Sequence, residues 1–119
     1  MFILKGILRA ETQEQILMYL LVREKGYGKA IAEFYSASQN AVQKQLIKLE
    51  DDGVVVSRAI GKLREYELNP RYPFLQPLMS LLKAGLAAYP KKIQNELVLT
   101  RERPRKAEKK LNRIRDDIE

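Results

Sequence analysis

Cysteine and histidine are both absent from this 119-residue chain. Their absence excludes disulfides, thiolate or imidazole metal ligands, and any nucleophile–base pair that uses either residue. No apolar run approaches the roughly 20 residues needed to cross a bilayer, and no basic stretch precedes the first apolar residues as it would in a signal peptide. We therefore expect a cytoplasmic protein without a membrane span, a bound metal or another cofactor.

The composition indicates one globular domain with a basic surface. An apolar content of 45% supports a folded core, and the net charge of +7 suits a polyanionic partner such as nucleic acid. We expect no enzymatic activity, because no histidine- or cysteine-based catalytic set exists and the Asp51-Asp52 pair has no glycine-rich phosphate loop beside it.

The first helix is expected to open at Thr12, because a threonine followed three positions later by Gln15 forms a capping box. Apolar residues at helical spacing then form one buried stripe, and Lys25-Gly26 is expected to end the helix. Residues 2–8, which precede it, fit either a short strand paired with a later hairpin or a helical turn packed on a partner subunit.

Two further helices follow, separated by a short polar break. The first spans about residues 28–35 and directs Ile31, Phe34 and Tyr35 inward. The second, residues 38–52, has Ser38 as its N-cap and an inward stripe of Val42, Leu46 and Leu49. Two helices joined by a tight turn and followed by a hairpin predict a winged helix-turn-helix, an α+β fold that is mainly helical.

The outward face of helix 38–52 is polar and free of acids until Glu50. Glutamine and asparagine can bond an adenine edge with two hydrogen bonds, and lysine can reach guanine or phosphate. The alternative is a solvated face, which would normally carry more glutamate. We interpret the segregation as a face that reads DNA, and its candidate residues are Ser38, Gln39, Asn40, Gln43, Lys44 and Lys48.

Residues 54–68 alternate as a hairpin, or wing, with its turn at Gly61-Lys62. Cations concentrate near this turn at Arg58, Lys62 and Arg64. They are either plain solubility residues or contacts to DNA phosphates, and their place beside helix 38–52 favours phosphates.

We expect the chain to consist of three segments: a DNA-binding domain (1–72), a helical dimerisation segment (73–100) and a basic C-terminal tail or helix (101–119). The middle segment has more apolar surface than a three-helix core needs, which favours a homodimer over burial by its own C-terminal residues. The candidate dimerisation residues are Leu75, Leu78, Met79, Leu82, Leu86 and Tyr89. The tail is either an arm on DNA or a solvated extension.

A family resemblance rests on two consecutive motifs. They read Val42-x3-Leu46-x2-Leu49-Glu50-x2-Gly53 and Ile60-Gly61-Lys62-x-Arg64-x-Tyr66-x-Leu68-Asn69-Pro70. Together they resemble winged-helix regulators of the ArsR-type superfamily, and more narrowly the small prokaryotic proteins with a C-terminal Arg-Pro-Arg motif found beside minimal nucleotidyltransferases. The resemblance implies a homodimeric regulator that binds double-stranded DNA through the candidate residues above.

The chain departs from that family in two ways. It lacks the cysteine and histidine ligands of the metal sensors, so metal-released repression is not expected. Its Arg103-Pro104-Arg105-Lys106 run continues as Ala107-Glu108-Lys109 instead of Gly-Lys-Pro. The leading hypothesis is a transcriptional repressor, and the alternative is a winged-helix protein–protein module, such as an antitoxin or an adaptor for a partner enzyme.

Overall fold

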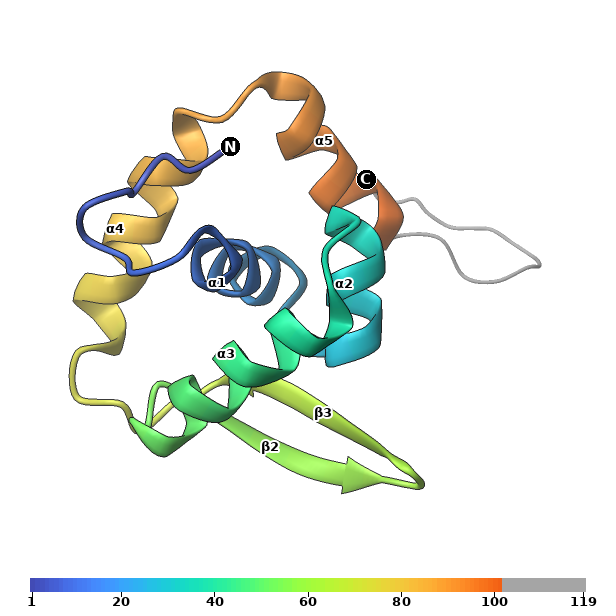
Figure 1. Cartoon of the computed structure of the whole chain (residues 1–119). Coiled ribbons are helices and arrows are strands. Elements are labelled where there is room, and N and C mark those ends of the chain that lie inside the picture. The colour runs from blue at the N-terminus through green and yellow to red at the C-terminus, as the bar shows by residue number, and fades with distance from the viewer. Residues whose placement is uncertain (102–119) are drawn as a thin grey trace. The chain divides into compact units, whose positions relative to one another are not determined.

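The computed structural model describes residues 1–101, with side chains through Val98. The chain divides into two compact units, Met1–Ala88 and Tyr89–Glu119. The elements, in order, are α1 (Glu11–Arg23), β1 (Lys25–Tyr27), α2 (Gly28–Tyr35), α3 (Gln39–Asp51), β2 (Val55–Ile60), β3 (Leu63–Leu68), α4 (Leu75–Ala87) and α5 (Lys91–Arg101) (Figure 1). The winged helix-turn-helix architecture predicted from the sequence is confirmed.

Helix α1 does not begin with the predicted capping box. Its N-cap is Ala10, which supplies no side-chain hydrogen bond, and the helix starts at Glu11. The first-turn side chains instead bind the preceding chain: the Glu14 carboxylate accepts hydrogen bonds from the backbone N–H of Ile3 (3.0 Å) and Leu4 (2.6 Å). The capping-box prediction was wrong because the N-terminal segment folds back onto this turn.

That N-terminal segment does not pair with the wing. The Leu4 carbonyl accepts from the N–H groups of Ile7 and Leu8, so the chain turns on itself, and the Leu4 side chain is buried. With its backbone held by Glu14, the segment packs as part of the first unit.

The strand that does pair with the wing is β1, which sequence periodicity did not reveal. Helix α1 ends at Arg23, Glu24 has a positive φ of 72°, and Lys25–Tyr27 then runs antiparallel to β3. The prediction that Lys25-Gly26 ends the helix as cation and glycine cap was wrong at this point. Three residues are too few to show a strand period, and their conformation is fixed by β3.

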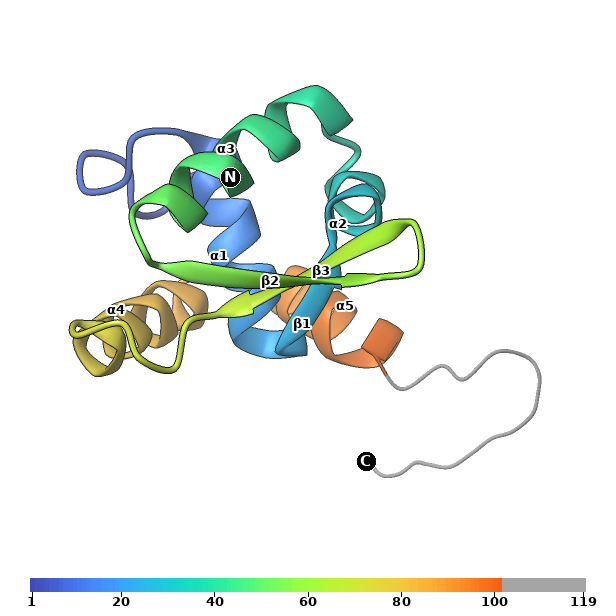
Figure 2. The same ribbon diagram turned by 90° about the horizontal axis from the view of Figure 1, so that it is seen from below.

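The sheet has the order β1-β3-β2, so β3 is its central strand. Strands β2 and β3 form the predicted hairpin, whose two-residue turn is Gly61-Lys62, with Gly61 at φ 61°. This left-handed conformation suits glycine. The hairpin projects beyond the helices of the first unit in Figure 1, and Figure 2 shows it from below.

The helix-turn-helix core is built as the sequence predicts. Val42, Leu46 and Leu49 of α3 are buried, as is Ile31 of α2. The Ser38 hydroxyl accepts from the backbone N–H of Ala41 (3.2 Å), which confirms Ser38 as the N-cap of α3. Burial of this stripe leaves the opposite face of α3 exposed.

The two remaining helices, α4 and α5, follow the wing in the chain. Helix α4 follows the wing within the first unit, and its Leu82 is fully buried. In the second unit the Gln94 amide donates to the Tyr89 carbonyl (2.8 Å) near the start of α5. Among the described residues, no helix is long and apolar enough to span a membrane. The predictions for the tail beyond Arg101 lie outside the described residues.

Candidate nucleic-acid interface

Every candidate base-reading residue on α3 is exposed. Ser38 caps the helix, and the polar side chains of its first two turns follow without an acid among them. The exposed set comprises Ser38, Gln39, Asn40, Gln43, Lys44 and Lys48. Ile47 also lies on the exposed side, with 49% of its surface accessible, and sequence reasoning did not include it.

Gln43 is held by the wing. Its amide nitrogen donates to the hydroxyl of Tyr66 at 3.3 Å, and Tyr66 is buried in the central strand β3. Gln43 is therefore both an exposed residue of α3 and a contact between that helix and the sheet. In the sequence, Tyr66 is one residue of the alternating segment 54–68, and nothing local links it to Gln43.

A second contact joins α3 to the wing through three side chains, which we call the helix–wing link: Glu50, Ser57 and Arg64. The Ser57 hydroxyl donates to the Glu50 carboxylate (2.6 Å) and accepts from the Arg64 guanidinium (3.0 Å). One of the three acids at the end of α3 thus has a structural partner in β2, although an acid there opposes the helix dipole.

The three wing cations have different surroundings. Arg58 lies opposite Glu65 in the ladder and forms an ion pair with it at 3.2 Å, so its charge is partly balanced. Arg64 is exposed while it donates to Ser57. Lys62 occupies the turn and forms no ion pair with another described residue. Positive charge available to a phosphate is therefore greatest at Lys62 and Arg64.

The wing tip also carries apolar surface. Ile60 and Leu63 face each other across the turn, with 39% and 51% of their surfaces exposed. Both residues belong to the predicted hairpin, but their exposure is not predictable from the sequence, because an exposed and a buried apolar residue look alike in a short strand.

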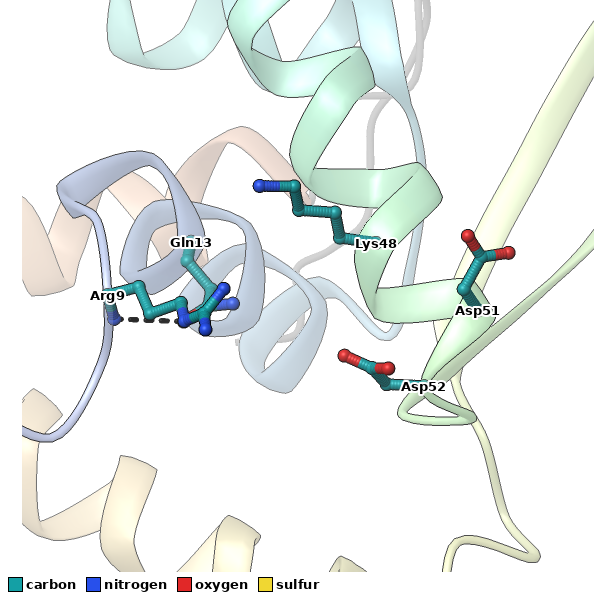
Figure 3. Close-up of a pocket in the computed structure, with 5 residues that line it drawn as sticks. All are labelled: Arg9, Gln13, Lys48, Asp51 and Asp52. Carbon is teal, nitrogen blue, oxygen red and sulfur yellow. Dashed lines mark hydrogen bonds between the residues drawn. The ribbon is translucent and has the colours of Figure 1, made fainter.

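Lys48 is exposed one turn beyond Lys44 on α3, and it also faces a cavity. It lines a cavity of about 600 Å³ together with Arg9, Gln13, Asp51 and Asp52. Figure 3 shows its ammonium group extending toward the start of α1. Of the six candidates, Lys48 alone lines this cavity.

The aromatic cluster at the end of α2 is internal. The ring of Phe34 packs edge-on against Tyr19 (5.8 Å between centroids) and Tyr35 (4.8 Å), and the Arg23 guanidinium lies over Tyr19 and Phe34. Burial raises the pKa of Tyr35 above its ordinary range, and its hydroxyl has no hydrogen-bond partner. These rings pack against the core, with Tyr19 buried and Phe34 and Tyr35 half-buried.

No family model matches the chain, and no curated protein matches it. Similar solved structures include three of ZitR from Lactococcus lactis. A double mutant in apo form is 20% identical, with a TM-score of 0.50 over 71% of this chain and 67% of ZitR. Another structure of that double mutant is 19% identical, with a TM-score of 0.52 over 77% of this chain and 65% of ZitR. A single mutant is 24% identical, with a TM-score of 0.52 over 81% of this chain and 70% of ZitR.

The chain has a winged-helix fold. At these identities the likeness extends to the fold alone and does not distinguish one winged-helix family from another. The narrower resemblance to the ArsR-type superfamily therefore stays a prediction.

The candidate dimerisation residues divide by burial. Leu75, Leu78, Met79 and Leu86 are half-buried, whereas Leu82 is fully buried within the chain and Tyr89 begins the second unit. Phe74, which precedes α4, has 63% of its surface exposed and was not among the candidates. A groove of about 290 Å³ lies between α1, β3 and α4. It is lined by the apolar residues Leu20, Leu21, Leu68, Pro70, Leu75 and Met79 and by the acids Glu24 and Glu67.

No group of three or more Asp, Glu, Cys or His residues that could hold a metal ion occurs among residues 1–101.

Proposed function

We propose that this protein is a transcriptional regulator that binds double-stranded DNA as a homodimer, most simply a repressor that occludes a promoter. The observation that carries the proposal is the exposed, acid-free face over the first turns of α3, placed beside exposed cations on a wing. Helix α3 would enter the major groove while the wing follows the backbone. The proposal places the protein in the ArsR-type superfamily and assigns it no catalytic residue.

The contacts follow from side-chain chemistry. Gln39, Asn40 and Gln43 would read adenine edges, and Lys44 would reach guanine or phosphate. Lys62 and Arg64 would neutralise phosphates, and each neutralised phosphate steepens the log–log salt dependence of binding by about 0.9.

Homodimerisation through α4 is the second element of the proposal. Its support is the row of half-buried apolar residues Leu75, Leu78, Met79 and Leu86, with exposed Phe74 at the start of the helix. A two-fold dimer would present two α3 helices to half-sites one DNA turn apart.

Selection of bound duplexes from a random pool, at low and moderate salt, tests the DNA-binding proposal. We expect an enriched motif with two-fold symmetry. Replacing Gln43 and Lys44 together with alanine should weaken binding to that motif by tenfold or more, because each good base contact is worth about 1–3 kcal/mol.

The matched control replaces the exposed pair Gln76 and Lys83 on α4, which removes the same side-chain types away from α3. The proposal fails if the pool yields no motif, or if both double mutants bind the motif as tightly as the parent chain.

The groove between α1, β3 and α4 favours a second candidate, a module that binds another protein. Its apolar residues are flanked by Glu24 and Glu67, which suits a basic apolar segment of a partner. Light scattering of the pure chain separates the two: a stable homodimer supports the regulator, and a monomer supports the partner-binding module.

A further inference from the structure

The cavity beside Lys48 lies between the start of α1 and the last turn of α3. Lys48 and Asp52 extend from α3 toward Arg9 and Gln13, whereas Asp51 points away from them (Figure 3). The four charged side chains form no ion pair with each other or with any other residue in the part of the chain the structure describes. Charges of opposite sign thus surround one space without neutralising each other directly.

A second, apolar cavity of about 390 Å³ adjoins the first, since Gln13 and Asp52 line both. Its other lining residues come from the segment before α1, α1, the end of α3, the residue before β2, the loop after the wing and α4: Leu8, Leu17, Leu49, Val54, Tyr72 and Leu78. The combined space has a charged side and an apolar side, and its size is in the range of small-molecule sites.

We propose that this combined cavity binds a zwitterionic small molecule with an apolar side chain, the chemistry of a hydrophobic α-amino acid. Its carboxylate would lie between Arg9 and Lys48, and its ammonium group would face Asp52. Both headgroup charges then gain charge-assisted hydrogen bonds, and the side chain contacts the apolar side of the cavity. A ligand of one charge would leave charged side chains of the opposite role, either Arg9 and Lys48 or Asp52, without a partner.

The position of the site gives it a regulatory consequence, which rests on the proposed DNA-binding function. Asp52 and Lys48 belong to the end of the helix whose beginning carries the candidate base-reading residues, and Leu78 belongs to the helix proposed for dimerisation. A ligand that binds one arrangement of α1, α3 and α4 better than another shifts the population toward it. The amino acid would then change the affinity for DNA.

Isothermal titration calorimetry of the full chain with L-leucine and L-phenylalanine tests binding without DNA. The comparison compounds are of three kinds. Glycine lacks the apolar side chain, 4-methylpentanoate and 3-phenylpropionate lack the amine, and isoamylamine and phenethylamine lack the carboxylate. We expect the two amino acids to bind and each comparison compound to bind at least about tenfold more weakly, since a lost charged contact or a lost apolar side chain each weakens binding by that order.

Two single variants locate the site, Arg9→Gln and Asp52→Asn. Both residues are exposed, so these substitutions leave the core intact. Each should weaken amino-acid binding by about threefold to tenfold. The matched controls Arg71→Gln and Glu33→Gln remove the same charges from exposed positions elsewhere and should leave the dissociation constant unchanged.

Three outcomes overturn the assignment: no heat from either amino acid at millimolar concentration, unchanged binding in both site variants, or tighter binding of the deaminated acids. Because the titration contains no DNA, its result does not depend on the regulator proposal. Amino-acid binding by a chain that selects no DNA motif would support the site and reject the proposed function.

Discussion

Replacement of Gly26 by alanine tests the strand that the sequence concealed. A Cβ atom at this position would lie 2.6 Å from Cε1 and 3.2 Å from Cδ1 of Tyr19, and 3.5 Å from Cγ1 of Ile31. Glycine is therefore required here for close packing of β1 on α1. The Tyr19 ring is buried and packs against Phe34 and Arg23, so it has little room to move aside.

The expected cost follows from overpacking. Inserting a methyl group into a filled core destabilises a protein by about 1–3 kcal/mol. For a unit of this size, each kcal/mol lowers the melting temperature by roughly 4–8 °C. Gly26→Ala should thus melt about 4–24 °C below the parent chain, as measured by circular dichroism at 222 nm, and urea unfolding should give the loss of about 1–3 kcal/mol directly.

Two further variants test whether the loss of stability comes from a clash with the Tyr19 ring. Lys25→Ala changes the neighbouring exposed residue of the same strand and should melt within a few degrees of the parent, as surface substitutions usually do. In a Tyr19→Leu background, where the ring is gone, Gly26→Ala should cost much less, which a double-mutant cycle measures. An unchanged melting temperature, or an equal loss in both backgrounds, would refute the proposed clash.

Three further predictions concern stability. Ser38→Ala should destabilise the chain by about 1 kcal/mol in urea unfolding because α3 loses its cap, whereas Ser80→Ala on the exposed side of α4 should change little. Ser57→Ala should cost about 0.5–1.5 kcal/mol in the same assay, since Glu50 then loses its hydrogen-bond donor. Tyr35→Phe should stabilise by about 1 kcal/mol, because it removes a buried hydroxyl without a partner. Burial raises the pKa of Tyr35, so the stability of the folded chain should fall as the pH rises above about 10, the pKa of an unfolded tyrosine. Urea unfolding at pH 9 and pH 11 should therefore show a smaller loss of stability in Tyr35→Phe than in the parent chain. An equal loss in both would contradict this cause.

Helix α3 and the hairpin were predictable because each carries a strong local signal. Val42, Leu46 and Leu49 repeat at helical spacing, Ser38 provides a cap that competes with nothing else, and Gly61 marks a turn that needs a positive φ. These signals depend on neighbours within a few residues, so they are readable without the rest of the fold.

The features that were missed depend on residues distant in sequence. Glu14 binds backbone groups ten and eleven positions away, which displaces the expected cap at Thr12. Strand β1 exists only because β3 pairs with it, with Gly26 opposite Tyr66. Gln43 and Tyr66 are 23 residues apart, so no local pattern links them.

The cavity by Lys48 shows the same limitation at the candidate site. Arg9 and Asp52 lie 43 positions apart, and only the packing of α1 against α3 brings them to one space. From the sequence, Lys48 was one more cation on a polar helix face. Its assignment to DNA or to the cavity depends on a direction that periodicity alone does not supply.

If Gln43 reads a base as proposed, its hydrogen bond with Tyr66 lowers the entropy cost of that contact. A free glutamine side chain loses roughly 1.5–2 kcal/mol of rotamer freedom when it is fixed. Here the sheet restricts that freedom when the chain folds, before a duplex arrives. A preorganised amide loses less entropy on binding, so more of its hydrogen-bond energy remains to separate one base from another. The central strand of the wing would thereby contribute to sequence discrimination without touching a base.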